Sequence, residues 1–167
     1  LSSRQVLDLV QNQGQGTDVE SLFVTWVFDD DTASLLAPRA AARTDYAALD
    51  TADGDWLPPQ AVRLPMARWD FAAAEARMAE FKPVVTEVVA VQNAATVGGI
   101  PVPAAVRATY EEAGGDTTAA EVVSGLRSGR TAVEGLADAA RISASGSPAA
   151  GSAARLCASQ GSTNRSG

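Results

Sequence analysis

The sequence predicts an all-α fold of helical hairpins or a helical bundle, with two units that each pair a short helix with a long helix. Three observations favour this fold. Apolar residues recur at helical spacing through most of the chain. Helix-start and helix-end signals bound these stretches. A Pro-x-Ala-Val-Arg motif occurs twice, at an offset of 44 residues. From about Ser143 the chain is rich in Ser, Gly and Ala without apolar periodicity, which predicts a disordered tail.

The N-terminal residues predict two helices. Residues 2–5 and 17–20 fit capping boxes, in which two side chains reciprocally satisfy free backbone N–H groups. We expect the first helix over residues 3–13 and the second over residues 18–28. Residues 22–28 are also rich in strand-forming types, and it is the capping box that favours a helix there. The apolar residues that would share one face of the second helix are Val19, Leu22, Phe23, Trp26 and Val27.

A third helix is expected over residues 37–50, with Pro38 in the first turn, where its missing N–H is not needed. Asp29, Asp30 and Asp31 precede it. These acids lack the alternate spacing and the distal Glu of a calcium loop. We therefore interpret them as a solvated turn and N-cap.

The repeated motif lies at residues 59–63 and 103–107, each time five residues after a glycine. Gly54 and Gly98 are expected to end the preceding helices, and a proline is expected to begin each short helix. The short helices are predicted over residues 59–68 and 103–113. Two units of about 44 residues fall in the length range of helical-pair repeats, although such arrays usually contain three or more units.

A long helix is predicted to follow each short helix, with Asp70 capping the first and Asp116 capping the second. Pro83 should kink or split the first long helix near residues 80–82, and Pro65 should do the same to the short helix before it. Apolar residues at alternating spacings of three and four predict that the long helices pack side by side. The predicted stripes are Phe71, Ala74, Met78, Phe81, Val85 and Val88 in the first, and Ala119, Val122, Leu126, Gly129, Val133, Leu136 and Ala140 in the second.

Composition argues against several classes of function. Net charge is −7, from 13 Lys and Arg against 20 Asp and Glu, and no basic patch contains interleaved aromatic residues, so nucleic-acid binding is not expected. No apolar run is long enough to span a membrane. The chain has no histidine, the usual base of Ser and Cys hydrolases and the commonest neutral zinc ligand. The single Cys157 is interpreted as an unreactive thiol in the tail.

No residue is assigned as catalytic, metal-binding or cofactor-binding, and no cofactor is expected. Residues 14–16 are too short for a dinucleotide-binding loop and follow a helix, not a strand. The tryptophans Trp26, Trp56 and Trp69 are interpreted as packing residues at helix junctions. Neighbouring helical residues point in different directions, so the remaining acids are interpreted as solvated surface. These acids are Asp53, Asp55, Glu111 and Glu112.

One segment resembles a known family. Residues 16–18 (Gly-Thr-Asp), with Leu22, Phe23, Trp26 and Val27, look like a segment found late in gluzincin-type, peptidase MA-like zinc metallopeptidases. This resemblance covers roughly residues 3–28. The following residues are similar in composition to Ala-rich helical regions that trail such domains in secreted or membrane-anchored proteins of high-GC actinobacteria.

The resemblance implies an extracytoplasmic, cell-envelope protein whose His-Glu-x-x-His zinc helix lies upstream of this chain. No residue here matches that helix, so no catalytic or metal-binding role is carried over. The chain begins with Leu1, and we expect it to be a fragment of a longer polypeptide. Such proteins often end in a membrane anchor, whereas residues 156–167 are polar.

We expect three regions: residues 1–31 as the helical end of an upstream peptidase-like domain, residues 32–142 as a repeat-like helical domain, and residues 143–167 as the tail. The first functional hypothesis is a non-catalytic C-terminal region with a structural or accessory role, partnered by the upstream catalytic domain. The alternative is an independent helical-repeat module that binds another protein or a peptide. Catalysis by this chain's own carboxylates would require a pocket that brings two buried acids together.

Overall fold

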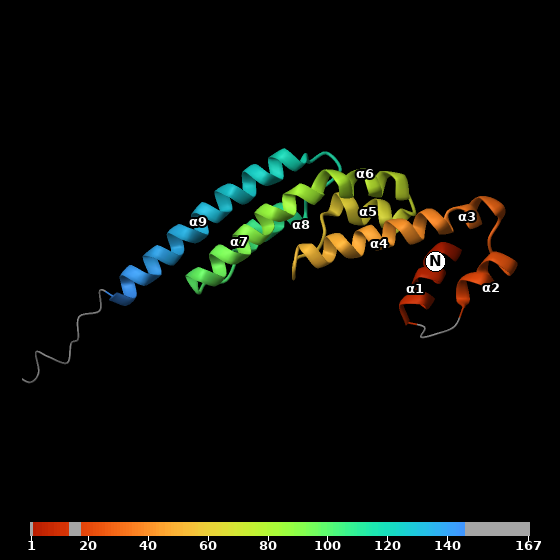
Figure 1. The fold of residues 1–167 in the computed structure, drawn as a ribbon, viewed down its shortest axis with the longest axis horizontal. Coiled ribbons are helices and arrows are strands. Elements are labelled where there is room, and N and C mark those ends of the chain that lie inside the picture. Colours follow the sequence, from red (N-terminus) through yellow and green to blue (C-terminus); the bar gives the residue numbers. More distant parts are fainter. Residues whose placement is uncertain (1, 14–17, 146–167) are drawn as a thin grey trace, which may run out of the picture.

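The computed structural model describes residues 2–13 and 18–145, and within these ranges every regular element is a helix. The predicted all-α class is confirmed. The helices form an elongated molecule with α1, α2 and α3 at one end and the last turns of α9 at the other (Figure 1). In chain order they are α1 (Ser3–Gln13), α2 (Val19–Trp26), α3 (Asp30–Ser34), α4 (Leu36–Ala52), α5 (Gln60–Arg68), α6 (Phe71–Phe81), the 3₁₀ helix η1 (Lys82–Val84), α7 (Val85–Gly98), α8 (Ala104–Glu111) and α9 (Ala119–Ser145).

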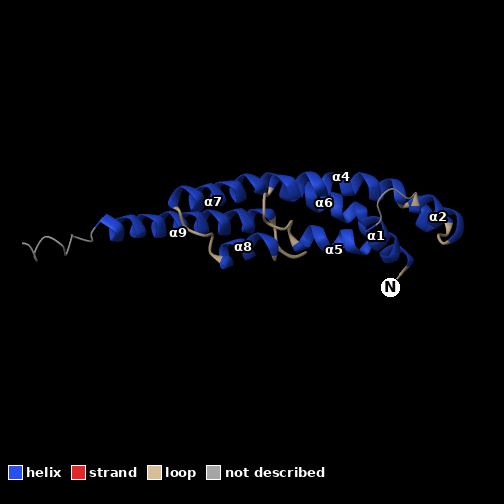
Figure 2. Ribbon diagram, turned by 90° about the horizontal axis from the view of Figure 1, so that it is seen from below, coloured by secondary structure: helices blue, strands red, loops and turns tan. Residues whose placement is uncertain are grey.

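The long and short helices pack in the same way twice along the molecule. Helices α4 and α5 both pack on α6, and helices α7 and α8 both pack on α9. Figure 2 shows α5 and α8 along one edge of the molecule and α4 and α7 along the opposite edge. Because α6 continues through η1 into α7, one helical segment belongs to both groups: α6 packs with α4 and α5, and α7 packs with α9.

The first helix begins and ends where the sequence predicts. The backbone N–H of Ser2 donates to Gln5 Oε1 at 2.9 Å, and the backbone N–H of Gln5 donates to Ser2 Oγ at 3.3 Å, which completes the capping box. The second helix is confirmed as a helix, ending at Trp26. Its described cap is Asp18, which accepts a bond from the backbone N–H of Ser21 at 3.1 Å. The capping box at 17–20 includes a residue outside the described part of the chain.

The run of three aspartates begins a short helix that the sequence analysis did not predict. Asp29 is an N-cap, as expected, and accepts a bond from the backbone N–H of Thr32 at 2.8 Å. The helix that it caps is α3, in which Asp30 and Asp31 occupy the first turn. Helix α4 follows after Leu35, so α3 and α4 cover more of the chain than the single helix expected over residues 37–50.

Pro83 splits the first long helix, as predicted, because η1 separates α6 from α7. The 3₁₀ turn also changes which side chains face the core. Its tighter winding places Val84 in the core with 0% exposure, while Val85, expected in the stripe, is only half-buried. Pro65 does not split the short helix, because α5 is one helix with Pro65 inside it. That helix packs on α6, and the Pro65 carbonyl accepts a bond from the backbone N–H of Asp70 at 3.0 Å.

The two long helices have different N-terminal caps. Asp70 caps α6, as expected, by accepting a bond from the backbone N–H of Ala73 at 3.2 Å. The predicted cap Asp116 was wrong, because α9 begins at Ala119. Thr118 and Glu121 form a reciprocal capping box instead, with N–H to oxygen distances of 2.8 and 3.3 Å. The chain from Gly114 to Thr117 forms a turn that includes Asp116, so α9 starts after this acid.

The glycines before the short helices have separate roles. Gly54 follows α4 with a φ of +78°, but at the second position it is Gly99, with a φ of +64°, that ends the helix, and Gly98 still belongs to α7. A Cβ atom on Gly98 would lie 2.5 Å from the Cβ of Ala137. Gly98 therefore permits the close approach of α7 and α9.

The apolar stripe of α9 follows the prediction as far as Val133 and then moves to Ala137, which leaves Leu136 54% exposed. A straight helix has 3.6 residues per turn, so its buried face drifts away from a repeat of 3.5 residues.

Two hydrophobic clusters form the core. One cluster contains Leu7, Leu36, Ala42, Leu49, Val62, Trp69, Phe71, Ala74 and Met78, and the other contains Trp56, Ala61, Phe81, Val84, Val88, Val91, Tyr110, Ala113, Val122 and Leu126.

The predicted tail begins inside the last helix. Residues 143–145 belong to α9, so the expected start of disorder at about Ser143 was placed too early. The rest of the predicted tail, with Cys157, lies outside the described residues.

Candidate binding surfaces and buried polar clusters

A buried acid lies where α4 ends against α8. The Tyr110 hydroxyl donates to Asp53 Oδ2 at 3.0 Å, and both side chains are fully buried. The Gln92 side-chain amide donates to the backbone carbonyl of Asp53 at 2.8 Å. The other carboxylate oxygen, Oδ1, has no hydrogen-bond partner among the described residues. Asp53 therefore is not on the solvated surface where the sequence analysis placed it.

This environment favours the neutral carboxylic acid. Burial raises the pKa of Asp53 from 3.8 to about 6, although the bond from Tyr110 acts in the opposite direction. Burial, and then the charge of Asp53, raise the pKa of Tyr110 well above its ordinary value. Of the carboxylates in residues 2–13 and 18–145, Asp53 is the one that is fully buried. A pair of buried acids, which catalysis by carboxylates would require, is not formed by the described residues.

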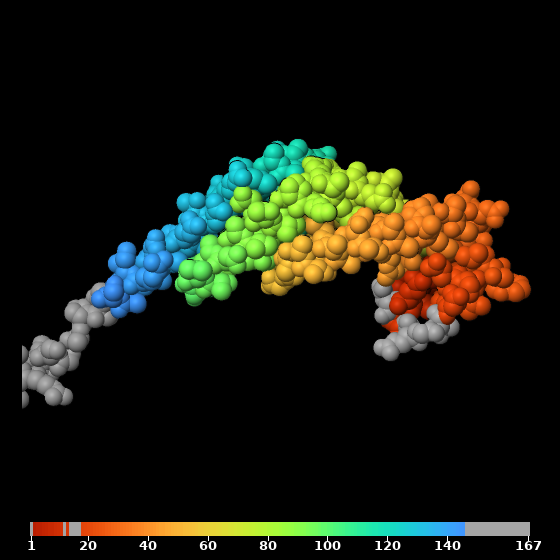
Figure 3. Space-filling model, in the orientation of Figure 1, coloured from red at the N-terminus to blue at the C-terminus, as the bar shows by residue number. Residues whose placement is uncertain are grey.

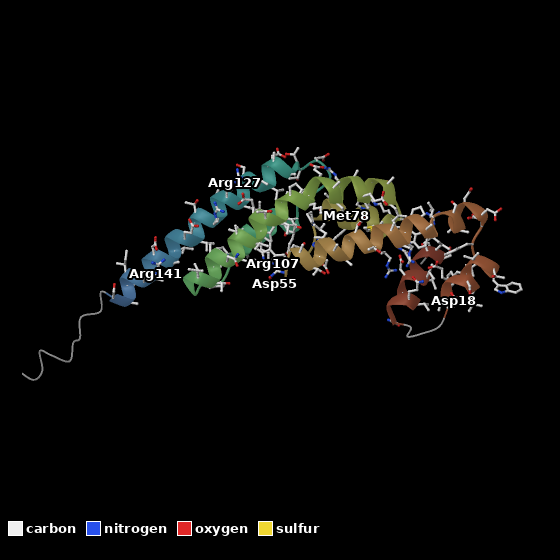
Figure 4. All side chains as sticks on the ribbon, in the orientation of Figure 1. Asp18, Asp55, Met78, Arg107, Arg127 and Arg141 are labelled. Atoms are coloured by element: carbon white, nitrogen blue, oxygen red, sulfur yellow. The ribbon has the colours of Figure 1, made fainter. Side chains whose placement is uncertain are left out.

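The arginines of the two Pro-x-Ala-Val-Arg motifs meet at the end of α8. Arg63 donates to the backbone carbonyls of Pro58 at 2.7 Å and Glu111 at 2.8 Å. Arg107 donates to Glu111 Oε1 at 2.7 Å and to the side chain of Asp55 at 3.3 Å, and Figure 4 shows Asp55 beside Arg107. The repeated arginines thus hold the bridge between α4 and α5 against α8.

The other acids of this junction differ in exposure. Glu111 also accepts a bond from the backbone N–H of Leu57 at 2.7 Å, and its side chain is 18% exposed. Its interpretation as a solvated acid was therefore wrong. The side chain of Asp55 is 80% exposed and Glu112 is exposed, in agreement with a surface position.

A second polar cluster connects α1, α4 and the turn after α5. The side chain of Arg39 is 4% exposed and donates to Asp8 Oδ1 at 3.1 Å and to Gln11 Oε1 at 2.7 Å. The indole N–H of Trp69 donates to the other oxygen of Asp8 at 2.8 Å. The Arg39 guanidinium also lies 5.1 Å from the centre of the Trp69 ring, a cation–π distance. Trp69 is a packing residue, as predicted, and so is Trp56, at 3% exposure.

A cleft of about 470 Å³ opens beside this cluster. We call it the arginine cleft. Its charged lining residues are Asp8, Arg39, Arg43 and Arg63, and its other lining residues include Tyr46, Met66, Trp69 and Phe71. The arginines come from α4 and α5, which no local sequence motif connects, so the sequence analysis did not identify them as a group.

Five of the eight residues of helix α2 are apolar, but none of its residues is buried. Val19 and Phe23 pack against the core cluster that contains Leu7 and Trp69. The remaining large apolar residues face solvent, and Trp26, predicted to close a helix junction, is 81% exposed. The α1–α2 hairpin lies at one end of the molecule, as the space-filling view also shows (Figure 3). We call the α2 apolar surface the set of Leu22, Val24, Trp26 and Val27, which are 53%, 44%, 81% and 51% exposed.

The described residues form neither a metal-binding group nor a membrane-spanning helix. Within residues 2–13 and 18–145, no group of three or more His, Cys, Asp and Glu side chains could hold a metal ion. No helix in the same ranges is both long and apolar enough to cross a membrane. The glycine-rich residues 14–16 and Cys157 lie outside the described part of the chain.

The described residues therefore offer a buried acid, an arginine-lined cleft and an exposed apolar surface. Comparison with models of protein families, with curated proteins and with solved structures finds no match for this chain.

Proposed function

We propose that this chain is a non-catalytic helical accessory region of a metallopeptidase-like cell-envelope protein, and that it packs against the catalytic domain through the α2 apolar surface. The observation that carries the proposal is that five of the eight residues of α2 are apolar and yet none of its residues is buried. The apolar face of a surface helix normally packs against protein. The partner domain would enclose it.

Burial of this surface would contribute several kcal/mol to the packing of two domains. A tryptophan side chain buries on the order of 200 Å². Because Trp26 is 81% exposed, its burial would contribute about 4 kcal/mol at roughly 25 cal/mol per Å². Leu22, Val24 and Val27 would add to this figure. Exposed apolar patches of this kind are typical of surfaces that pack against another protein.

The choice of partner rests on the family resemblance of residues 3–28. The residues that carry it, among them Leu22, Trp26 and Val27, belong to α2 or its C-cap, and these three form most of the α2 apolar surface. A segment that ends a peptidase-like domain would be expected to pack against that domain with its apolar residues. The same residues thus support both the resemblance and the contact.

The test begins with the source DNA, in which a His-Glu-x-x-His helix should be encoded upstream of Leu1. The longer polypeptide would then be produced with Trp26 or with Trp26→Ser. We expect the substitution to change the unfolding free energy of residues 1–167 alone by less than about 0.5 kcal/mol, since the side chain is exposed. In the longer polypeptide it should cost about 2 kcal/mol or more.

The absence of a zinc-helix sequence upstream would overturn this assignment. So would a Trp26→Ser substitution that has the same small effect in both polypeptides. Val97→Ser is a matched control, because Val97 is 85% exposed but lies at the end of α7, away from α2.

A second function, an independent module that binds a helical peptide, is favoured by a different observation. A groove of about 430 Å³ lies between α4 and the α6–α7 segment, with Leu49, Met78 and Val85 among its apolar lining residues. Its charged lining residues are two exposed acids, Asp45 and Glu75, and one base, Lys82. An apolar groove with acidic neighbours fits a basic amphipathic helix.

The two functions can be separated by mutation. Asp45→Lys combined with Glu75→Lys should abolish binding of such a peptide, whereas Trp26→Ser should not affect it. Loss of peptide binding in the Trp26 variant alone would count against the groove.

A further inference from the structure

We infer that the arginine cleft binds a small organic carboxylate with an apolar body. The cleft joins three arginines to an aromatic and aliphatic lining in a volume of about 470 Å³. This volume is within the range of small-molecule sites. The inference is independent of the proposed packing function, because the cleft is lined by α1, α4, α5 and the start of α6 and includes no residue of α2.

The cleft carries an excess of positive charge in a chain whose net charge is −7. Its lining has three arginines and one acid, Asp8. Both oxygens of Asp8 already accept hydrogen bonds, one from Arg39 and the other from the indole N–H of Trp69. Asp8 also lies 3.7 Å from Arg43 Nη1, and Glu20, which is outside the lining, lies 3.8 Å from Arg39 Nη1. Three arginines against these two acids leave a net positive charge at the cleft.

Arg63 is the arginine whose charge is least compensated. Its two described hydrogen bonds go to the backbone carbonyls of Pro58 and Glu111, and no carboxylate in the described residues lies within ion-pair distance of it. These bonds hold the guanidinium in place at the cleft. A carboxylate is the group that pairs best with such a fixed, planar donor.

The remaining lining indicates what the rest of the ligand looks like. Met66, Trp69 and Phe71 offer apolar contact. Tyr46 is half-buried, and burial raises its pKa, so its hydroxyl keeps its proton and can donate a hydrogen bond to an anion. A carboxylic acid with a ring or short aliphatic chain matches this combination. A polyanion would be repelled by the acidic remainder of the chain.

The experiment uses the full chain and phenylacetate as the probe. Binding would be followed by calorimetry and by the chemical shift of the Trp69 indole N–H, which lies at the cleft through its bond to Asp8. Phenylacetamide has the same ring without the charge, and inorganic phosphate has the charge without the ring. We expect saturable binding of phenylacetate that is at least about tenfold tighter than that of either control compound.

Two variants locate the binding. Arg63→Gln and Arg43→Gln should each weaken phenylacetate binding by about tenfold or more. Arg43 is 40% exposed, so its substitution keeps the fold even if that of Arg63 does not. The matched control is Arg127→Gln on α9, a 62% exposed arginine that pairs with Glu87 away from the cleft. An equal response to phenylacetamide or phosphate would overturn the inference, and so would unchanged binding in Arg43→Gln.

Discussion

Replacement of Asp53 by asparagine should make this protein more stable at neutral pH, although it removes a charge from a fully buried position. The carboxylate is buried beside Tyr110, with one oxygen bonded to the hydroxyl and the other without a partner in the described residues. Burial therefore raises the pKa of Asp53 from 3.8 to about 6. Asparagine has a similar shape, can accept the same hydrogen bond and does not ionise.

The sign and size of the effect follow from linkage. Between about pH 4 and pH 6 the folded chain holds a proton at Asp53 that the unfolded chain has lost, so the stability of the wild type falls as pH rises through this window. The difference between about 6 and 3.8, at about 1.4 kcal/mol per pH unit, gives a cost of about 3 kcal/mol at neutral pH. The asparagine amide would itself lack one partner, so we expect a net gain of about 1–2 kcal/mol.

Urea denaturation followed by circular dichroism, at a series of pH values from about 4 to 8, measures this effect as the difference between variant and wild type. The variant must be compared with the wild type because the burial of Asp53 is not the only cause of the pH dependence of stability. The pKa values of Asp29, Glu80 and Glu121 are lowered, and the stability that they contribute is lost as pH falls.

At about pH 4 the variant should be less stable than the wild type by about 1–2 kcal/mol, because its amide lacks one partner at every pH, and the difference should rise by about 3 kcal/mol to the net gain above about pH 6. Asp55→Asn, in a side chain that is 80% exposed, should leave the pH dependence unchanged. The reasoning would be refuted if Asp53→Asn destabilised the protein at neutral pH, or if variant and wild type differed equally at every pH.

Three further predictions concern other parts of the fold. Gly129→Ala should destabilise the protein by about 1–3 kcal/mol, because a Cβ there would lie 2.5 Å from a methyl group of Val106. A Cβ at Gly135 in the same helix would have no atom within 4 Å, so Gly135→Ala should stabilise the protein by up to about 1 kcal/mol. Chemical denaturation of both variants checks the pair. Asp8→Asn should cost about 2 kcal/mol, since Arg39 is buried and keeps only weaker partners, and thermal melts should show a lower Tm. Asp138→Asn, in an exposed ion pair, should change Tm by little.

The features that sequence reasoning predicted well are those that depend on neighbouring residues. The bounds of α1, the capping role of Asp70 and the break at Pro83 all follow from residues within one or two turns of each other. Local hydrogen bonding and a missing N–H suffice to produce them. The missed cap of α9 belongs to the same class, because Thr118 and Glu121 carry a capping-box signal that was present in the sequence.

The features that sequence reasoning missed depend on residues far apart in the chain. Asp53 resembles any acid at a helix end until Tyr110, which is 57 residues away, is placed over it. Arg39 is 31 residues from Asp8, and Trp69 is 61 residues from it. For Trp26, sequence reasoning predicted a contact that the described residues do not make. An apolar helix face predicts burial, but it does not identify what covers the face.

The continuous segment α6–η1–α7 has a practical consequence for dividing this protein into smaller pieces. Ending the chain at Gly98 would remove α8 and α9 and leave Val88, Val91 and Ala95 of α7 without a cover. Starting the chain at Val85 would remove Phe81 and Val84 from the cluster that includes Leu126. Neither half would retain all the helices that pack around its hydrophobic cluster, so limited proteolysis should yield no stable half-size product. Backbone amides at the centre of this segment should exchange with solvent only when the whole molecule unfolds.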